Sequence, residues 1–185
     1  MLMSTALASA TGCHGVVMPA RIGAGDTELQ LRGMGLREAT WLDVDVYVAG
    51  LYLPAGARVA AAALAPETAK QMRLQLLRDV SREEMAGNIE AGFRKAAGSR
   101  FAQHRAALDV LLAMIPPLSE GESFILDYRP RADDPGGVLQ LWHGSRVLGG
   151  LSGGDFGRTL FAIWLGDAPL SAALKSALLG GPCNG

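Results

Sequence analysis

The sequence of 185 residues lacks an excess of charge of either sign, with 17 lysines and arginines, 18 acidic residues and a formal net charge of −1. It contains no run of basic residues and no basic patch interleaved with aromatic side chains. Nucleic-acid binding depends on such positive patches, so we expect no nucleic-acid partner. The chain also lacks an apolar run long enough to cross a bilayer, so we expect no membrane span.

Residues that bind metals or attack substrates are also scarce. The two cysteines, Cys13 and Cys183, stand near opposite ends of the chain and the three histidines are scattered, so zinc-ligand spacing is missing. The cysteines form a disulfide only if the two chain ends meet. No serine stands in a nucleophile-elbow context, and the glycine-rich stretch at residues 150–157 lacks the lysine of a phosphate-binding loop. We therefore expect no metal and no cofactor.

The first 20 residues, MLMSTALASATGCHGVVMPA, are small and apolar and carry no charge before Arg21. This composition is typical of the later part of a secretory signal, and the small residues of ALASA suit a signal-peptidase site. The charged start of such a signal is missing, which leaves a plain N-terminal tail as the alternative. We expect residues 1–20 to be an export segment or leader and residues 21–185 to be the folded domain. The expected location is the periplasm or the exterior, and otherwise the cytoplasm.

What the sequence does contain is apolar material for a core, 49% of all residues, arranged in strand and helix patterns. Alternating patterns predict strands at residues 26–34, within the stretch 33–54, and at residues 70–79, 122–130, 138–143 and 146–149. Patterns of period 3.6 predict helices at residues 59–64, 82–97, 100–115, 155–165 and 170–179. Strands that are segregated from helices along the chain predict an α+β fold, in which an antiparallel sheet carries helices on one face.

The stretch from residue 33 to residue 54 holds the longest strand pattern. Between residues 41 and 48, apolar residues at even positions alternate with polar or amphipathic residues at odd positions, which predicts a strand with one face in the core. Gly50 interrupts the pattern and predicts a bulge or a close backbone approach. Upstream, the glycines of residues 33–35 predict a turn that would aim Arg37 back across the sheet.

A second feature is the start of the first long helix. Ser81 and Glu84 form a capping box, in which a serine at the helix start is followed three residues later by a glutamate. Arg78 precedes it, at the end of the strand pattern of residues 70–79, and falls on the apolar row of that strand. Both arginines, Arg37 and Arg78, are thus predicted at the ends of apolar sheet surfaces.

Several segments resemble the chalcone isomerase-like superfamily. GLREATWL and DVDVYVAGLYLP resemble its opening strands, and LQLLRDVS, ESFILDYRP and GGDFGRTLFAIWLGDAPLSAALKSALLG resemble its bacterial members in the same order. The resemblance covers roughly residues 26–180. It implies the open-faced antiparallel β-sandwich of that superfamily, with helices packed on one face.

The resemblance also bears on catalysis. In the plant enzymes an arginine after the glycine turn helps to hold a substrate oxygen, and Arg37 matches it within GLRE. Asn88 matches an asparagine on the first helix of the enzymes. The other enzyme side chains are replaced, by approximate register, at Tyr47, Ser81, Glu84 and Gly157. We therefore expect no flavanone-forming activity, and an isomerase or intramolecular lyase acting on an unsaturated carbonyl compound is the alternative.

The fatty-acid-binding relatives in this superfamily keep an arginine and a tyrosine that hold a carboxylate at the end of an apolar cleft. Tyr47 resembles that tyrosine, and an arginine fork with a phenol hydroxyl suits a carboxylate. The resemblance implies a non-catalytic binder of a small apolar anion, with a ligand site at Arg37, Tyr47, Arg78 and Asn88. Two alternatives stay open: the arginines pair only with the acidic residues that follow them, or the chain is a structural or partner-binding module.

Overall fold

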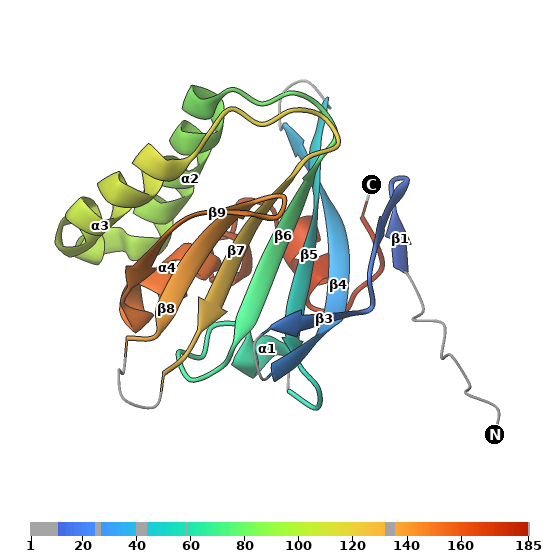
Figure 1. Ribbon diagram of the computed structural model, residues 1–185, viewed down its shortest axis with the longest axis horizontal. Coiled ribbons are helices and arrows are strands. Elements are labelled where there is room, and N and C mark those ends of the chain that lie inside the picture. Colours follow the sequence, from blue (N-terminus) through green and yellow to red (C-terminus); the bar gives the residue numbers. More distant parts are fainter. Residues whose placement is uncertain (1–10, 25–26, 40–43, 58, 132–135, 185) are drawn as a thin grey trace.

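The protein is described by a computed structural model that covers residues 11–24, 27–39, 44–57, 59–131 and 136–184. Seven antiparallel strands form one sheet, follow each other in chain order and curl into a half-barrel (Figure 1). They are β3 (Arg21–Ala24), β4 (Thr27–Ala39), β5 (Val44–Pro54), β6 (Lys70–Leu76), β7 (Ser123–Arg129), β8 (Val138–His143) and β9 (Arg146–Ser152). The predicted α+β fold with an antiparallel sheet is confirmed.

Helices cover one face of the sheet and bury its apolar side. They are α2 (Arg82–Ala97), α3 (Phe101–Met114), α4 (Gly154–Leu165) and α5 (Ala172–Leu178), while the short α1 (Val59–Ala62) lies at one end of the sheet (Figure 1). The hydroxyl of Ser81 accepts the backbone N–H of Glu84 at 3.1 Å, so the predicted cap of α2 is confirmed. None of the helices in the described part of the chain is long and apolar enough to cross a membrane.

The opposite face of β4 and β5 is covered by the N-terminal hairpin, β1 (Thr11–Cys13) and β2 (Val16–Met18). Together they enclose a second core, made of Cys13, Met18, Leu29, Met34, Leu36, Val48, Tyr52 and Ala69. A disulfide joins Cys13 to Cys183, with a Cα–Cα distance of 5.8 Å, so the two chain ends do meet. Residues 1–10 of the expected leader lie outside the described residues, and export remains a prediction.

Residues 41–43 of the predicted strand pattern lie outside the described residues, and Val44 and Asp45 are exposed. From Val46 to Leu53, β5 is buried on both faces, so the prediction of a single core face is wrong for this part of the strand. Tyr47 faces the helices, whereas Val48 faces the second core. Gly50 pairs regularly with its neighbours on both sides and holds no bulge. A Cβ at Gly50 would lie 2.4 Å from the sulfur of Met18, so a methionine side chain, and not a second backbone, takes the space beside this glycine.

The predicted turn at residues 33–35 is also wrong, because β4 continues through both glycines, with one extra residue, Arg32, just before Gly33. A Cβ at Gly33 would lie 2.0 Å from the carbonyl oxygen of Ala177, and one at Gly35 would lie 2.8 Å from the Cβ of the same alanine. These glycines let α5 pack directly on the strand. Arg37 is therefore aimed by its place on β4, two residues beyond Gly35, and not by a turn.

Candidate functional site

A cavity of about 360 Å³ lies between the sheet and helices α2 and α4, and we call it the pocket. Its walls are Arg37, Ala39, Val46, Tyr47, Val80, Glu84, Met85, Asn88, Ile89, Trp164 and Leu170. Small-molecule sites in proteins are typically clefts of about 300–1,000 Å³ with mostly apolar walls and a few placed polar groups. The size and composition of the pocket fit that description.

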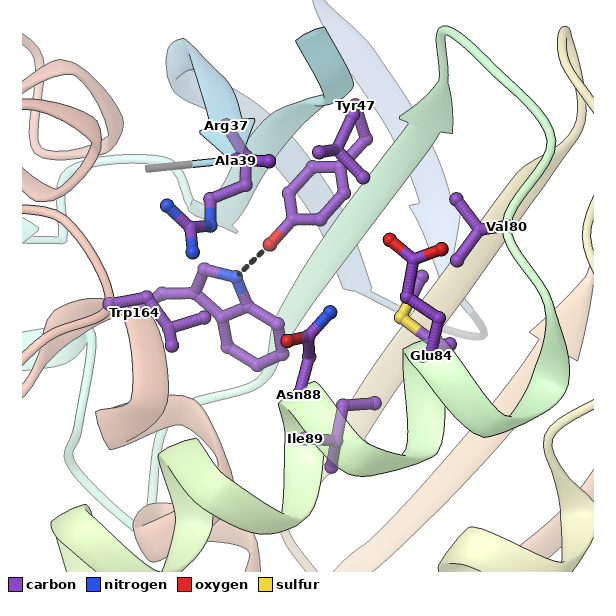
Figure 2. Close-up of a pocket in the computed structure, with 11 residues that line it drawn as sticks. Arg37, Ala39, Tyr47, Val80, Glu84, Asn88, Ile89 and Trp164 are labelled. Carbon is purple, nitrogen blue, oxygen red and sulfur yellow. Dashed lines mark hydrogen bonds between the residues drawn. The ribbon is translucent and has the colours of Figure 1, made fainter. Parts of the chain in front are cut away.

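A bulge in β5 builds the sheet side of the pocket. The strand register passes from Arg37 opposite Tyr47 to Glu38 opposite Asp45, so Val46 is the extra residue of β5. The consequence is that Val46 and Tyr47, which are neighbours in the chain, both line the pocket. Arg37 lies directly across from Tyr47 and shares its side of the sheet. Figure 2 shows both side chains reaching from the sheet toward Trp164 on α4.

Tyr47 is a buried hydrogen-bond donor. Its side chain is 5% exposed, and its oxygen accepts a 2.9 Å hydrogen bond from the indole Nε1–H of Trp164. Because an indole nitrogen can only donate, the phenol O–H itself is left to donate, and it has no acceptor among the described residues. Burial raises the pKa of Tyr47, against the opposing effects of the Trp164 hydrogen bond and the Arg37 charge. The hydroxyl therefore keeps its proton at neutral pH.

Arg37 brings a positive charge to the pocket. The side chain is half-buried, and its Nη1 donates a 2.6 Å hydrogen bond to the backbone carbonyl of Glu38. The carboxylate of Glu38 forms no ion pair with it, and no other described carboxylate does. The structure therefore does not support the alternative in which Arg37 only pairs with its acidic neighbour.

Arg78 reaches the pocket only through a partner. Its guanidinium forms a double hydrogen bond with the carboxylate of Glu84, with Nη1 at 3.1 Å from Oε2 and Nη2 close to Oε1. Nη1 also donates to the backbone carbonyl of Asp79 at 2.8 Å. Arg78 does not line the pocket, but Glu84 does. Since Arg78 neutralises Glu84, the uncompensated charge of the pocket is that of Arg37.

Helix α2 supplies the remaining wall. Asn88 is exposed and stands one turn after Glu84, while Met85 and Ile89 are buried and apolar. Three of the four residues expected at the site, Arg37, Tyr47 and Asn88, thus line one cavity, in the arrangement drawn in Figure 2.

Trp164 lines the pocket but is not among the residues that the sequence predicts there. It is one of three tryptophans, its side chain is 2% exposed, and the sequence pattern marks it only as part of the inward stripe of a helix. A buried indole N–H needs an acceptor, which is a signal for a polar partner, but the identity of that partner follows only from the fold.

Comparison with known proteins gave two findings. A family model described as chalcone isomerase-like matches residues 10–180. The crystal structure of a fatty-acid binding protein from Arabidopsis thaliana superposes with a TM-score of 0.71 at 17% identity, over 93% of this chain and 96% of that chain. The search of curated proteins found no match. The structural likeness shows a shared fold, and the expected open-faced sandwich with helices on one face is confirmed.

Proposed function

Because the chain belongs to the chalcone isomerase-like family, we propose that it binds a small apolar anion in the pocket and releases it unchanged. The proposed ligand is a fatty acid or an amphiphile of the same kind. The similar Arabidopsis protein is named a fatty-acid binding protein, which supports this ligand class.

The observation that carries the proposal is the pairing of Arg37 with Tyr47 at one end of an apolar pocket. A guanidinium fork and a protonated phenol supply donors to a carboxylate, and neither is matched by a free carboxylate in the described part of the pocket. Val46, Met85 and Ile89 supply the apolar walls against which a hydrocarbon chain would lie. A carboxylate with an aliphatic tail satisfies both halves of the pocket at once.

The pocket offers little to an isomerase. No histidine, cysteine or lysine is among its lining residues, and Glu84 is their one carboxylate. Both oxygens of Glu84 bond to Arg78, so neither is free to take a proton from a substrate. General acid–base catalysis needs a group that is free to exchange a proton at the reacting atom, and the raised pKa of the buried Tyr47 holds its proton in place, so this phenol offers a hydrogen bond rather than a base. Binding without reaction is therefore the function that we favour.

We also propose that the protein works outside the cytoplasm. The disulfide between Cys13 and Cys183 supports this location, because such bonds persist in oxidising compartments. Cleavage of an export segment within ALASA, at residues 6–10, would leave Cys13 and the hairpin of residues 11–18 in the mature chain. Fractionation of cells with intact-mass measurement tests this, and a cytoplasmic product that retains Met1 would contradict it.

Native mass spectrometry of the protein purified from cells tests the binding function. We expect an adduct with the mass of an anionic lipid, in a one-to-one complex, that added laurate displaces. The Arg37→Met variant, purified in parallel, should carry much less of it. A wild-type protein that carries no lipid and does not bind laurate would refute the proposal, and rapid flavanone formation from a chalcone would favour the isomerase instead.

A further inference from the structure

A second cavity, of about 680 Å³, lies on the face of the sheet opposite to the helices, and we call it the outer groove. Its floor is formed by side chains of β6, β7 and β8 that alternate with those facing the helices, chiefly Gln71, Arg73, Asp127, Arg129, Gln140 and Trp142. Gly23 of β3 and the β8–β9 turn stand at its rim. Figure 1 looks onto this face, with α4 behind the sheet. The outer groove shares no lining residue with the pocket.

An interlocked polar network forms the floor of the outer groove. Asp127 is 6% exposed and accepts hydrogen bonds from Gln71 Nε2 at 3.0 Å, Arg129 Nη2 at 2.6 Å and Arg129 Nε at 2.8 Å. This side-on pairing commits one edge of the Arg129 guanidinium to Asp127. The network also fixes the orientation of the Gln71 amide. Its nitrogen donates to Asp127, so its oxygen points the other way and is left to accept.

Three polar atoms of the outer groove are buried and have no partner in the described part of the chain: Nη1 of Arg129, Nε of Arg73 and Oε1 of Gln71. Buried donors and acceptors in proteins are almost always paired, so a group of three on one surface calls for an explanation. Arg129 neutralises the charge of Asp127, and Arg73 forms no ion pair with a described carboxylate. Two arginines and one aspartate give the outer groove a net positive charge.

We propose that the outer groove is a second ligand site, for a small hydroxylated organic anion of the sugar-acid kind. Its carboxylate would accept hydrogen bonds from Arg73 and from Nη1 of Arg129, since arginines suit planar anions. A hydroxyl would donate to Oε1 of Gln71, and the C–H face of a ring would lie against the half-buried ring of Trp142. Ile125 and Trp142 are the large apolar side chains among the lining residues and the other non-glycine residues there are polar or charged, so we expect the two cavities to take different ligands.

Calorimetric titration with three probes tests the chemistry of the outer groove. Glucuronate carries a carboxylate and hydroxyls, glucose carries only hydroxyls, and benzoate carries only a carboxylate. We expect glucuronate to bind at least about tenfold more tightly than either of the others, since each missing group forfeits a charge-assisted or neutral hydrogen bond. A glucuronate affinity equal to that of glucose or benzoate would overturn the proposal.

Matched arginine variants locate the binding. Arg73→Gln should weaken glucuronate by about tenfold or more without lowering the melting temperature, because Arg73 holds no described partner, and it should leave laurate binding intact. Arg37→Met should weaken laurate binding and leave glucuronate binding intact. The inference fails if wild-type protein shows no saturable glucuronate binding, if Arg73→Gln binds it as well as wild type, or if glucuronate and laurate compete. It also fails if the protein dimerises through the outer groove, which sedimentation would show as a wild-type dimer and an Arg73→Gln monomer.

Discussion

Trp164 and Tyr47 stand 117 positions apart in the chain and are joined by a 2.9 Å hydrogen bond from the indole nitrogen to the phenol oxygen (Figure 2). The bond ties α4 to β5 across the pocket. It also settles which way the tyrosine can act, because an oxygen that accepts from the indole has its own proton left to donate. The indole thus takes one side of the phenol oxygen and leaves the proton of Tyr47 for the proposed head-group contact.

Substitution of the two partners separates their roles. Tyr47→Phe removes the donor to the ligand and leaves the buried Trp164 N–H unpaired, so it should lower laurate affinity about tenfold and the free energy of unfolding by about 1–3 kcal/mol. Trp164→Phe should destabilise the fold but keep most of the affinity, since the phenol O–H is still present. Urea denaturation and calorimetry measure both effects. A Tyr47→Phe protein that binds laurate as wild type does would exclude Tyr47 from the head-group contact.

Arg78 should influence binding without lining the pocket. Arg78→Met frees the carboxylate of Glu84 at the pocket wall, so repulsion should weaken laurate about fivefold, with a smaller loss at high salt. The free energy of unfolding should change by no more than about 1 kcal/mol, because the pair is partly exposed. Adding Glu84→Gln to Arg78→Met should restore the affinity. Failure of that double variant to recover binding would show that Arg78 acts in another way.

Lys70 gives the fold a pH dependence of known sign. Its side chain is 1% exposed, Nζ donates to the carbonyls of Ala63 and Ala65, and burial lowers the pKa of Lys70 from 10.5 to about 8. Between these two values the unfolded chain binds more protons than the folded one, so stability rises with pH across that window. The free energy of unfolding of wild type, relative to Lys70→Met, should rise by up to about 1.4 kcal/mol per pH unit. Denaturation curves of the two proteins from pH 7.5 to 10 measure this difference, and a constant difference would contradict the prediction.

The disulfide should stabilise the fold strongly. Cys13 and Cys183 are 170 positions apart, so the bond restricts the unfolded chain over nearly its whole length and also holds the hairpin of residues 11–18 on the second core. The double variant Cys13→Ser, Cys183→Ser should lose about 2–5 kcal/mol of unfolding free energy. Wild type in dithiothreitol should match the variant. A melting temperature indifferent to reductant would show that the chain ends are held by packing alone.

Local signals in the sequence were enough for the main elements. The capping box at Ser81 and Glu84 predicts the start of α2, and alternation predicts the antiparallel strands, because both patterns depend on residues close together in the chain. The resemblance to known relatives adds Arg37, Tyr47 and Asn88, which the structure brings to one cavity. The cap and the strands could be predicted because their neighbours in sequence are also their neighbours in space, whereas the three site residues lie on separate elements and came from the resemblance alone.

The misses come from long-range packing. Glycines at residues 33 and 35 predict a turn when only local conformation is considered, but here they make room for Ala177 on α5, 140 or more positions away. The bulge at Val46 carries no glycine to mark it, and the two three-residue strands at 11–18 are too short to give a period.

Matching enzyme positions by approximate register also placed Ser81 and Gly157 near a site. The structure uses Ser81 as the cap of α2, while Gly157 packs against the ring of Tyr128, where a Cβ would lie 3.0 Å away. Neither residue lines the pocket. Sequence register therefore placed both residues on the correct helices, but it could not say which positions of those helices line a cavity.

The central claim is that Arg37 holds an anionic head group, and a calorimetric titration of laurate into wild type, Arg37→Met and Arg37→Lys tests it most directly. Charge-assisted hydrogen bonds contribute roughly 1.5–3 kcal/mol, so Arg37→Met should weaken laurate by roughly 10- to 150-fold, and Arg37→Lys should recover part of the loss. Arg73→Met, an arginine-to-methionine change on the other face of the sheet, is the matched control and should bind as wild type does. All four proteins should melt at similar temperatures. Unchanged affinity in Arg37→Met, or a lowered melting temperature with binding intact, would show that Arg37 serves the fold and that the ligand site is elsewhere.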